Sequence, residues 1–314
     1  MDHIKEKVNT ISEWGKYPEQ RSIEEALKRS LIIIDKPAGP TSHQVSSWVQ
    51  DLFDCKAGHS GTLDPQVTGV LPMGLRYSVR VIDLLHNVPK EYVAALHFHG
   101  NVSFSSVEEI LEEFKGEIYQ MPPLRSGVKR ERRIRTIHEI EILDHTDRNY
   151  LFLVRCESGT YIRTLCKDIG KALGTGGHMM DLRRIKSGVF TEEESFILQD
   201  IKDAQDSYKE GASIDLEQIL VPYERALDVF PKIKIKDTAA GSILNGADLA
   251  VPGILEMDDF ERGDTVSLIS TKNEGIAIGE SVYNAEEIMN MEEGLVVKTD
   301  RVFHPVGEYP KKWK

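Results

Sequence analysis

One carboxylate lies in a glycine-rich stretch whose composition predicts a shaped loop. Residues 58–72 read Gly-His-Ser-Gly-Thr-Leu-Asp-Pro-Gln-Val-Thr-Gly-Val-Leu-Pro, and three glycines and two prolines argue against a regular helix or strand over the first half. Asp64 is the one acidic residue of this stretch, and Pro65 restricts its backbone. A carboxylate on such a loop can act as a general base, a nucleophile or a metal ligand, or it can simply form a turn. The residue types alone leave these roles open.

The residues around Asp64 match a known pattern. The run His59-Ser60-Gly61-Thr62-Leu63-Asp64-Pro65, followed by Thr68-Gly69-Val70-Leu71-Pro72, resembles the catalytic loop of the TruB/dyskerin family of pseudouridine synthases. In that family the aspartate of the loop is essential, so the resemblance implies that Asp64 is catalytic. It also implies the reaction: the N-glycosidic bond of a uridine in RNA breaks, and the base turns and rejoins the ribose through carbon 5. The base must leave its stack first, and no cofactor or metal is needed.

Three further motifs follow in the order of the family. Lys90-Glu91-Tyr92 resembles a Lys-x-Tyr motif whose tyrosine stacks on the target base, although Tyr92 could equally be a core residue. Residues 159–163, Gly-Thr-Tyr-Ile-Arg, resemble a motif whose arginine pairs with the catalytic aspartate, and Leu182 lies in a third motif, residues 181–188. The resemblance thus implies that the catalytic residues are Asp64, Tyr92 and Arg163. It implies that the substrate pocket includes His59, Arg80, Tyr161 and Leu182.

Residues 125–135 form the densest basic run of the chain. They contain one acid and six basic side chains, namely Arg125, Lys129, Arg130, Arg132, Arg133 and Arg135. Such a run is often only a solvated loop, but it is also the natural place for contacts with RNA phosphates. The family carries a similar Gln-x-Pro-Pro stretch with basic residues as a mobile loop that closes over RNA.

Regular elements are expected on both sides of these motifs. The apolar residues 31–35 predict a strand, and the Thr41-Ser42 capping signal predicts a helix through about Phe53. Helices are predicted over 79–85, over 106–119 and from about residue 160, and strands over 92–99 and 150–156. His97 and His99 share one face of a strand, a spacing that could chelate a metal. We expect a packed pair, because no third ligand is apparent in the sequence.

Composition and charge narrow the class of protein. The chain has 314 residues and a formal net charge of −12, but residues 1–190 are nearly neutral, and the acidic excess lies in residues 191–314. The global sign therefore does not exclude RNA. With no apolar signal segment or membrane span, we expect a cytoplasmic protein. Cys55, Cys156 and Cys166 are expected to be reduced structural cysteines.

The C-terminal part predicts a separate small barrel. Lys232-Ile233-Lys234-Ile235-Lys236 alternates as a strand, and apolar strands are predicted at 265–270 and 276–281 between glycine turns. Residues 246–253 and 263–266 resemble a PUA domain, an RNA-binding module, and the three lysines are expected to form its basic face. The predicted fold is α+β, with a mixed, mostly antiparallel central sheet flanked by helices plus this barrel. The expected division is an N-terminal extension packing on the C-terminal domain (1–30), a catalytic domain (31–230), a PUA domain (231–306) and a tail (307–314).

Three functions fit this organisation. The extension, the PUA stretch and the arginine-rich loop favour the guided type of the family, closest to the archaeal form, in which an H/ACA guide RNA selects uridines in rRNA or tRNA. The family's partners are then a zinc-ribbon-like protein, a Gly/Arg-type β-barrel protein and a kink-turn binder. The alternatives are a stand-alone synthase acting on the T-loop of tRNA and a non-catalytic RNA scaffold. The set Asp64, Tyr92 and Arg163 argues against the scaffold.

Overall fold

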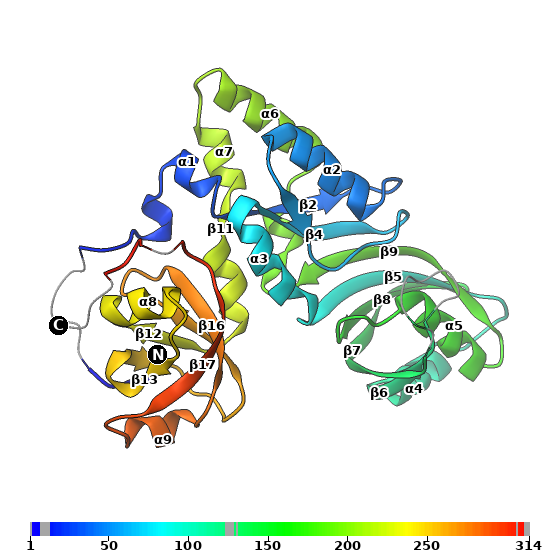
Figure 1. Ribbon diagram of the computed structural model, residues 1–314. Helices are drawn as coiled ribbons and strands as arrows, with labels where there is room; N and C mark the ends of the chain where they lie inside the picture. Colours follow the sequence, from blue (N-terminus) through cyan, green and yellow to red (C-terminus); the bar gives the residue numbers. More distant parts are fainter. Residues whose placement is uncertain (1, 7–12, 123–128, 130, 306, 311–314) are drawn as a thin grey trace. The chain divides into compact units, whose positions relative to one another are not determined.

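The chain forms two compact units, each assembled from segments that are far apart in the sequence. The computed structural model describes residues 2–6, 13–122, 129, 131–305 and 307–310 (Figure 1). Unit 1 comprises Met1–Leu31, Gly74–Val81 and Leu220–Lys314, and unit 2 comprises Ile32–Met73 and Ile82–Ile219. The predicted catalytic domain (31–230) includes residues 74–81 and 220–230. In the structure these two segments belong to unit 1.

The larger sheet is mixed and mostly antiparallel, as predicted. In the described part of the chain its ten strands are β2 Ser30–Lys36, β3 Ala57–His59, β4 Thr68–Leu75, β5 Lys90–Phe98, β6 Gly116–Gln120, β7 Arg133–Thr146, β8 Asn149–Cys156, β9 Gly177–Ser187, β10 Phe190–Thr191 and β11 Val221–Pro222. Their order is β11-β2-β4-β9-β5-β8-β7-β6, with β3 on β4 and β10 on β9. The β4–β9 pair is parallel, whereas β5 is antiparallel to β8 and β9, and β7 to β6 and β8.

The helices are short, and none in the described ranges is long and apolar enough to cross a membrane. They are α1 Ile23–Ala26, α2 Ser42–Phe53, α3 Val79–Ile82, α4 Phe104–Glu113, α5 Ile162–Ala172, α6 Leu198–Lys209, α7 Ile214–Ile219, α8 Asp237–Leu244 and α9 Ala285–Met289. Helix α2 begins as predicted, with a capping box between Thr41 and Gln44. The helix predicted over 106–119 is wrong at its end. Gly116 has a φ of 92°, which ends the helical path, and β6 follows.

The core of unit 2 lies between the sheet and the pair α4 and α5, which lie beside β6, β7 and β8 in Figure 1. Ala94, Leu96 and Phe98 alternate along β5 and point into this core, because successive side chains of a strand face opposite sides. Leu63 and Val67, from the loop on both sides of Asp64, belong to the same cluster. The loop is therefore anchored in the core.

Unit 1 has a core and a sheet of its own. In the described residues its seven strands are β1 His3–Ile4, β12 Lys232–Ile235, β13 Leu249–Ala250, β14 Ile254–Met257, β15 Thr265–Ile269, β16 Gly275–Ser281 and β17 Leu295–Val302. Their order is β1-β14-β12-β15-β16-β17-β13. Strand β1 pairs with β14, and Lys5 Nζ donates to the carbonyls of Ile288 and Met289 at the end of α9. The first residues of the chain are thus part of this unit.

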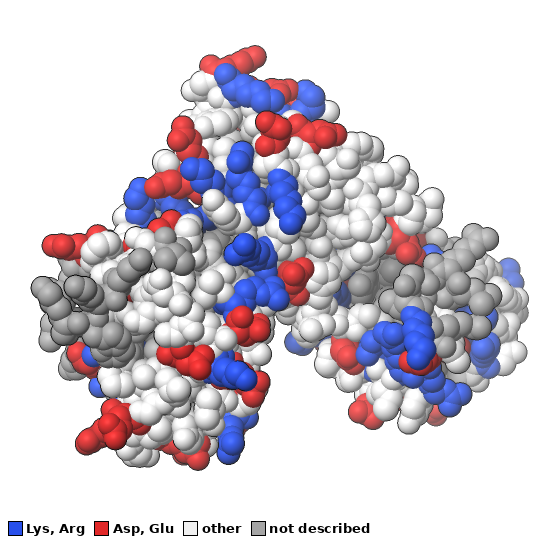
Figure 2. All heavy atoms as spheres, in the orientation of Figure 1, with Lys and Arg blue, Asp and Glu red and all other residues white. Residues whose placement is uncertain are grey.

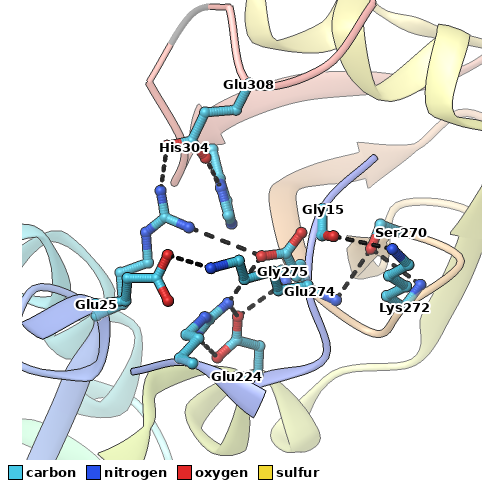
Figure 3. Close-up of polar contacts among 12 residues, drawn as sticks. Gly15, Glu25, Glu224, Ser270, Lys272, Glu274, Gly275, His304 and Glu308 are labelled. Atoms are coloured by element: carbon cyan, nitrogen blue, oxygen red, sulfur yellow. Dashed lines mark hydrogen bonds and ion pairs between the residues drawn. The ribbon is translucent and has the colours of Figure 1, made fainter. Parts of the chain in front are cut away.

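A buried network of ion pairs holds the segments of unit 1 together (Figure 3). Both terminal nitrogens of Arg21 contact Glu224, at 2.9 and 2.6 Å, and Nη2 also contacts Glu274 at 3.2 Å. Arg29 contacts Glu274 at 3.7 Å and pairs with Glu308. The side chains of Arg21 and Glu274 are each 2% exposed. Because both guanidiniums are matched by carboxylates, they can be buried, and the network joins residues 21–29 to residues 224, 274 and 308.

Candidate active site

The loop that carries Asp64 is fixed through its backbone. At the start of α2, Ser42 Oγ accepts a hydrogen bond from the Leu63 amide at 2.9 Å and donates one to the Leu63 carbonyl at 3.0 Å. The Val67 amide donates to the Asp64 carbonyl at 3.0 Å, which closes a turn through Pro65. Leu63 and Val67 are each 4% exposed, but the Asp64 side chain is 61% exposed. The fold thus holds the backbone and leaves the carboxylate accessible.

Lys36, the last residue of β2, supports this loop through backbone carbonyls. Its ammonium is fully buried and donates to the carbonyls of Pro37, Pro65 and Val67 at 2.8, 3.2 and 2.9 Å. Burial lowers the pKa of Lys36, while the nearby charge of Asp64 acts in the opposite direction. The loop is therefore bound by a buried cation close enough to Asp64 for the two charges to interact.

Arg163 reaches Asp64 from the first turn of α5. Its Nη2 donates to Asp64 Oδ2 at 2.9 Å, and the two side chains are 57% and 61% exposed. The buried Gln120 fixes the start of this helix, since its side-chain amide accepts from the Tyr161 amide and donates to the Tyr161 carbonyl. Exposed ion pairs add little stability. The contact is better explained as one that orients an ionised carboxylate.

Tyr92 and Leu182 complete the same site from β5 and β9. In the antiparallel pairing, Tyr92 lies opposite Arg184, and Ala94 lies opposite Leu182. Tyr92 is half-buried and close enough to Asp64 for that charge to act on it. Burial raises the pKa of Tyr92, and the positive charge of Arg184 opposes this effect. The structure therefore brings together Asp64, Arg163, Tyr92 and Leu182, all within unit 2.

The remaining predicted pocket residues have different settings. His59 Nδ1 contacts Ser46 Oγ at 2.7 Å, and Nε2 contacts Thr62 Oγ1 at 3.1 Å. Burial lowers the pKa of His59 to about 4, and nearby positive groups add to this shift, so the ring is neutral and braces the loop. Tyr161 is half-buried and precedes α5. Arg80 belongs to unit 1, where its carbonyl accepts from Arg301 at 2.8 Å.

The basic run is less free than its composition suggests. Arg125 and Arg130 lie outside the described residues. Lys129 pairs with Glu131, and Arg135 pairs with Glu157 at 3.1 Å. Among the described residues, Arg132 and Arg133 contact no carboxylate, and the Arg132 guanidinium lies 5.8 Å from the centre of the Tyr119 ring. Figure 2 shows Lys and Arg atoms (blue) gathered beside the grey atoms at the lower right.

The barrel lysines do not form a free basic face, which corrects that expectation. Each of them contacts an acid of unit 1. The pairs are Lys232 with Asp228 at 2.6 Å, Lys234 with Glu256 at 3.4 Å and Lys236 with Glu6 at 2.5 Å. Because these acids already neutralise the lysines, alternation along the strand is no guide to RNA contacts here.

His97 of β5 and His99, which follows the strand, have a third histidine as a neighbour that the sequence did not indicate. His178 of β9 lies opposite His97, and its Nδ1 is 2.9 Å from Nε2 of His99. His97 Nδ1 contacts Asn149 Oδ1 at 2.6 Å. Even so, the described part of the chain contains no group of three His, Cys, Asp or Glu placed to hold a metal ion.

Comparison with known families covers almost the whole chain. Residues 50–162 match the TruB family pseudouridylate synthase N-terminal domain, and residues 163–228 match the tRNA pseudouridylate synthase B C-terminal domain. Residues 231–303 match the PUA domain, and residues 2–46 match the DKCLD domain. Together with the fold and the geometry around Asp64, these matches define an RNA-modifying isomerase, a pseudouridine synthase that carries a PUA module.

Similar sequences and solved structures show to which family this chain belongs. "Probable tRNA pseudouridine synthase B" of Methanocaldococcus jannaschii is 45% identical over 314 residues, which cover 99% of this chain and 94% of the relative. A chain of a solved Cbf5-Nop10-Gar1 complex is 43% identical with a TM-score of 0.94, over 98% of this chain and 95% of that chain. A chain of an H/ACA RNP bound to a substrate RNA is 41% identical with a TM-score of 0.93, over 99% and 96%. The chain belongs to the TruB family of pseudouridine synthases.

Proposed function

We propose that this chain is the catalytic subunit of an H/ACA guide ribonucleoprotein, in which a guide RNA selects uridines of rRNA or tRNA for isomerisation. The observation that carries this proposal is the N-terminal segment. Residues 2–46 match the DKCLD domain, and the part of this segment up to Leu31 belongs to unit 1. There it bonds to the residues that match the PUA domain: β1 pairs with β14, Lys5 donates to Ile288, and Arg21 and Arg29 both contact Glu274. The similar chains of the solved H/ACA complexes support it.

The arrangement around Asp64 suits the reaction. Attack on either the ribose or the base requires a carboxylate held in a fixed orientation, and the hydrogen bond from Arg163 orients Asp64. In this proposal Tyr92 stacks on the extruded uracil, and Leu182, which belongs to the apolar cluster that Tyr92 packs against, helps to exclude water. His59 and Lys36 keep the loop in shape. The residues that act directly are therefore Asp64, Tyr92 and Arg163.

The proposed partners follow from the proposed function in a guide ribonucleoprotein. Nop10 and Gar1 are named in the solved complexes that this chain resembles. We propose that equivalents of these proteins, a zinc-ribbon-like and a Gly/Arg-type barrel protein, bind this chain. The third proposed partner is a kink-turn binder. Arg132 and Arg133 are the described candidates for phosphate contacts with the bound RNA.

A stand-alone tRNA synthase is the second candidate. It is favoured by the curated relatives, several of which are named "Probable tRNA pseudouridine synthase B". In this case the PUA module would grip the tRNA itself, and no guide would be required. The non-catalytic scaffold is the weakest alternative, because an accessible aspartate–arginine pair serves no purpose in a scaffold.

Dependence on the guide separates the candidates. The full chain, with and without the partner proteins, is given a guide-paired RNA or a free tRNA, and pseudouridine is measured under single-turnover conditions. We expect product on the paired target only when the guide is present, and a large loss when the ACA end of the guide is removed. Equal rates on tRNA without any guide would favour the stand-alone enzyme. Shortening the guide RNA is a sounder test than truncating the protein. Cutting the chain at Phe230 would remove most of unit 1 and leave residues 1–31 without their core.

A further inference from the structure

Arg184 is a buried cation to which the sequence motifs assign no role. It is 1% exposed, and its Nε donates to the Val70 carbonyl at 2.7 Å. Among the described residues, no carboxylate pairs with it, and its Nη2 has no hydrogen-bond partner. Buried arginines are ordinarily matched by an acid, because an uncompensated charge is unfavourable in the interior. A guanidinium kept in this state calls for an explanation.

The loop that carries Asp64 closes around this residue on both sides. A Cβ at Gly61 would lie 3.0 Å from Arg184 Nη1, and a Cβ at Gly69 would lie 2.1 Å from the Arg184 carbonyl oxygen. Both glycines also have positive φ angles, of 66° and 101°. Since Gly61 precedes Asp64 and Gly69 follows it, both arms of the loop are shaped to the position of Arg184.

Tyr92 is the cross-strand partner of Arg184. Burial lowers the pKa of Arg184, and its interaction with the Tyr92 hydroxyl acts in the opposite direction. A second buried cation, Lys90, lies nearby, but its Nζ already donates to the carbonyls of Leu85, His86 and Val88. The Arg184 guanidinium is thus the cation directed at Tyr92.

The reaction creates negative charge where this cation would act. When the bond between C1′ and N1 breaks, both electrons remain with the uracil, and the charge spreads over the ring. The new bond then forms from C5 to C1′, and the proton on C5 is released. Attack of Asp64 on the base instead of the ribose also places negative charge on the ring. A fixed positive charge behind the ring stacked on the uracil stabilises this state.

We propose that Arg184 is a positioning residue of the pseudouridylation site. Its guanidinium holds the Tyr92 hydroxyl and the two arms of the Asp64 loop in register, and its unpaired charge favours the anionic uracil that Tyr92 contacts. The inference rests on the proposed roles of Asp64 and Tyr92.

A double-mutant cycle tests this role. Single-turnover rates are measured for wild type, Tyr92→Phe, Arg184→Met and the double variant. Arg184→Met should slow the reaction by about 100-fold or more, by comparison with the loss of one preorganised donor, with RNA affinity changed by less than about threefold. If Arg184 acts through the Tyr92 hydroxyl, Tyr92→Phe should slow the Arg184→Met enzyme much less than it slows wild type. Effects that simply multiply would overturn the proposal.

Three controls keep the test decisive. Arg183→Met removes the same charge one residue away, from a side chain that pairs with Asp35 and Glu192, and it should leave the rate within a few-fold. Thermal melting detects loss of folding. If Arg184→Met does not fold, the same cycle with Arg184→Lys decides, and independence from Tyr92→Phe there rejects the proposal. Asp64→Asn checks the underlying assignment separately, because residual activity in that variant would disprove the role of Asp64 whatever the cycle shows.

Discussion

Two buried groups of charges in this protein solve the same physical problem in opposite ways. In unit 1 the cations are matched by acids, and the members are Arg21, Arg29, Glu224, Glu274 and Glu308. In unit 2 the cations are matched by backbone carbonyls, and the members are Lys36, Lys90 and Arg184. Within the described residues, none of these three contacts a carboxylate. Asp64, the acid nearby, is exposed instead.

The difference separates stability from reactivity. A carboxylate bound by buried cations is neutralised and fixed, which favours a unique structure. Carbonyl groups satisfy the hydrogen bonds of a cation but do not neutralise its charge, so Lys36 and Arg184 place positive charge behind the Asp64 loop. Lys90 contributes less, because burial lowers its pKa to about 7. This positive charge lies behind the exposed Asp64 carboxylate without covering it. Charge therefore stabilises the structure of unit 1, whereas in unit 2, on the proposed role of Asp64, it serves the reaction.

The comparison depends first on Asp64 being the reacting acid. Asp64→Asn should lower the rate by at least about a thousandfold, because the amide is neither a nucleophile nor a base. RNA affinity and melting temperature should stay close to wild type, since the side chain is exposed. Release of tritium from carbon 5 of labelled uridine measures the rate. Asp51→Asn on α2 is the matched control, and substantial activity in Asp64→Asn would remove the basis of the comparison.

Breaking the ion-pair network in unit 1 should lower stability and leave the reaction rate unchanged, the opposite of what is expected for Asp64→Asn. Glu274→Gln leaves Arg21 and Arg29 partly unmatched in the interior and should cost about 3–5 kcal/mol of unfolding free energy. Denaturant titration of the variant gives this value. The single-turnover rate should be unchanged wherever the variant remains folded. A slow but fully stable variant would mean that the two groups of charges do not have separate roles.

The pH dependence of stability tests a third group, the neutral His59 ring of the Asp64 loop. Burial holds the pKa of His59 at about 4, below its ordinary value of 6.5, so between these values the unfolded chain binds a proton that the folded chain does not. Stability should therefore fall as the pH drops from about 6.5 to about 4, by at most about 3 kcal/mol. His59→Gln should flatten this part of the curve. His138→Gln, at an exposed position, should not flatten it.

The smallest effect is expected at the surface of unit 2. Replacing Arg132 and Arg133 by Ala should weaken RNA binding regardless of sequence and flatten the log–log salt slope by up to about 0.7 per lost contact on single strands. Filter binding at several salt concentrations measures the slope. Lys171→Ala, which removes a cation already paired with Asp168, is the control. An unchanged slope would show that the run is only a solvated loop.

Some of this architecture was predictable, because it depends on local patterns. The strand before Lys36, the capping box at Thr41 and the helix that carries Arg163 all follow from the spacing of apolar residues and from caps. The contact between Arg163 and Asp64 was anticipated only through the family resemblance. It joins residues 99 positions apart, and no local pattern indicates such a pair.

The buried cations could not be recognised in the same way. Lys36 and Arg184 look like ordinary charged residues in a turn and in a basic strand, and only the fold shows that carbonyl groups surround them. The error at Lys234 and Lys236 has the same cause, because Glu256 and Glu6 approach these lysines from other parts of unit 1. A sequence gives the charges of side chains but not their partners.

The composition of unit 1 has a consequence for synthesis on the ribosome. Residues 1–31 are made first, but the rest of their unit lies mainly in residues 220–314. At cellular rates of translation, about 190 residues separate these segments by roughly 10–40 s. Unit 2 ends at Ile219, so its own segments are complete while the first-made stretch still lacks Glu224, Glu274 and Glu308. Arg21 and Arg29 stay hydrated through this interval, and unit 1 is completed when residues 1–31 dock onto the later-made residues 220–314.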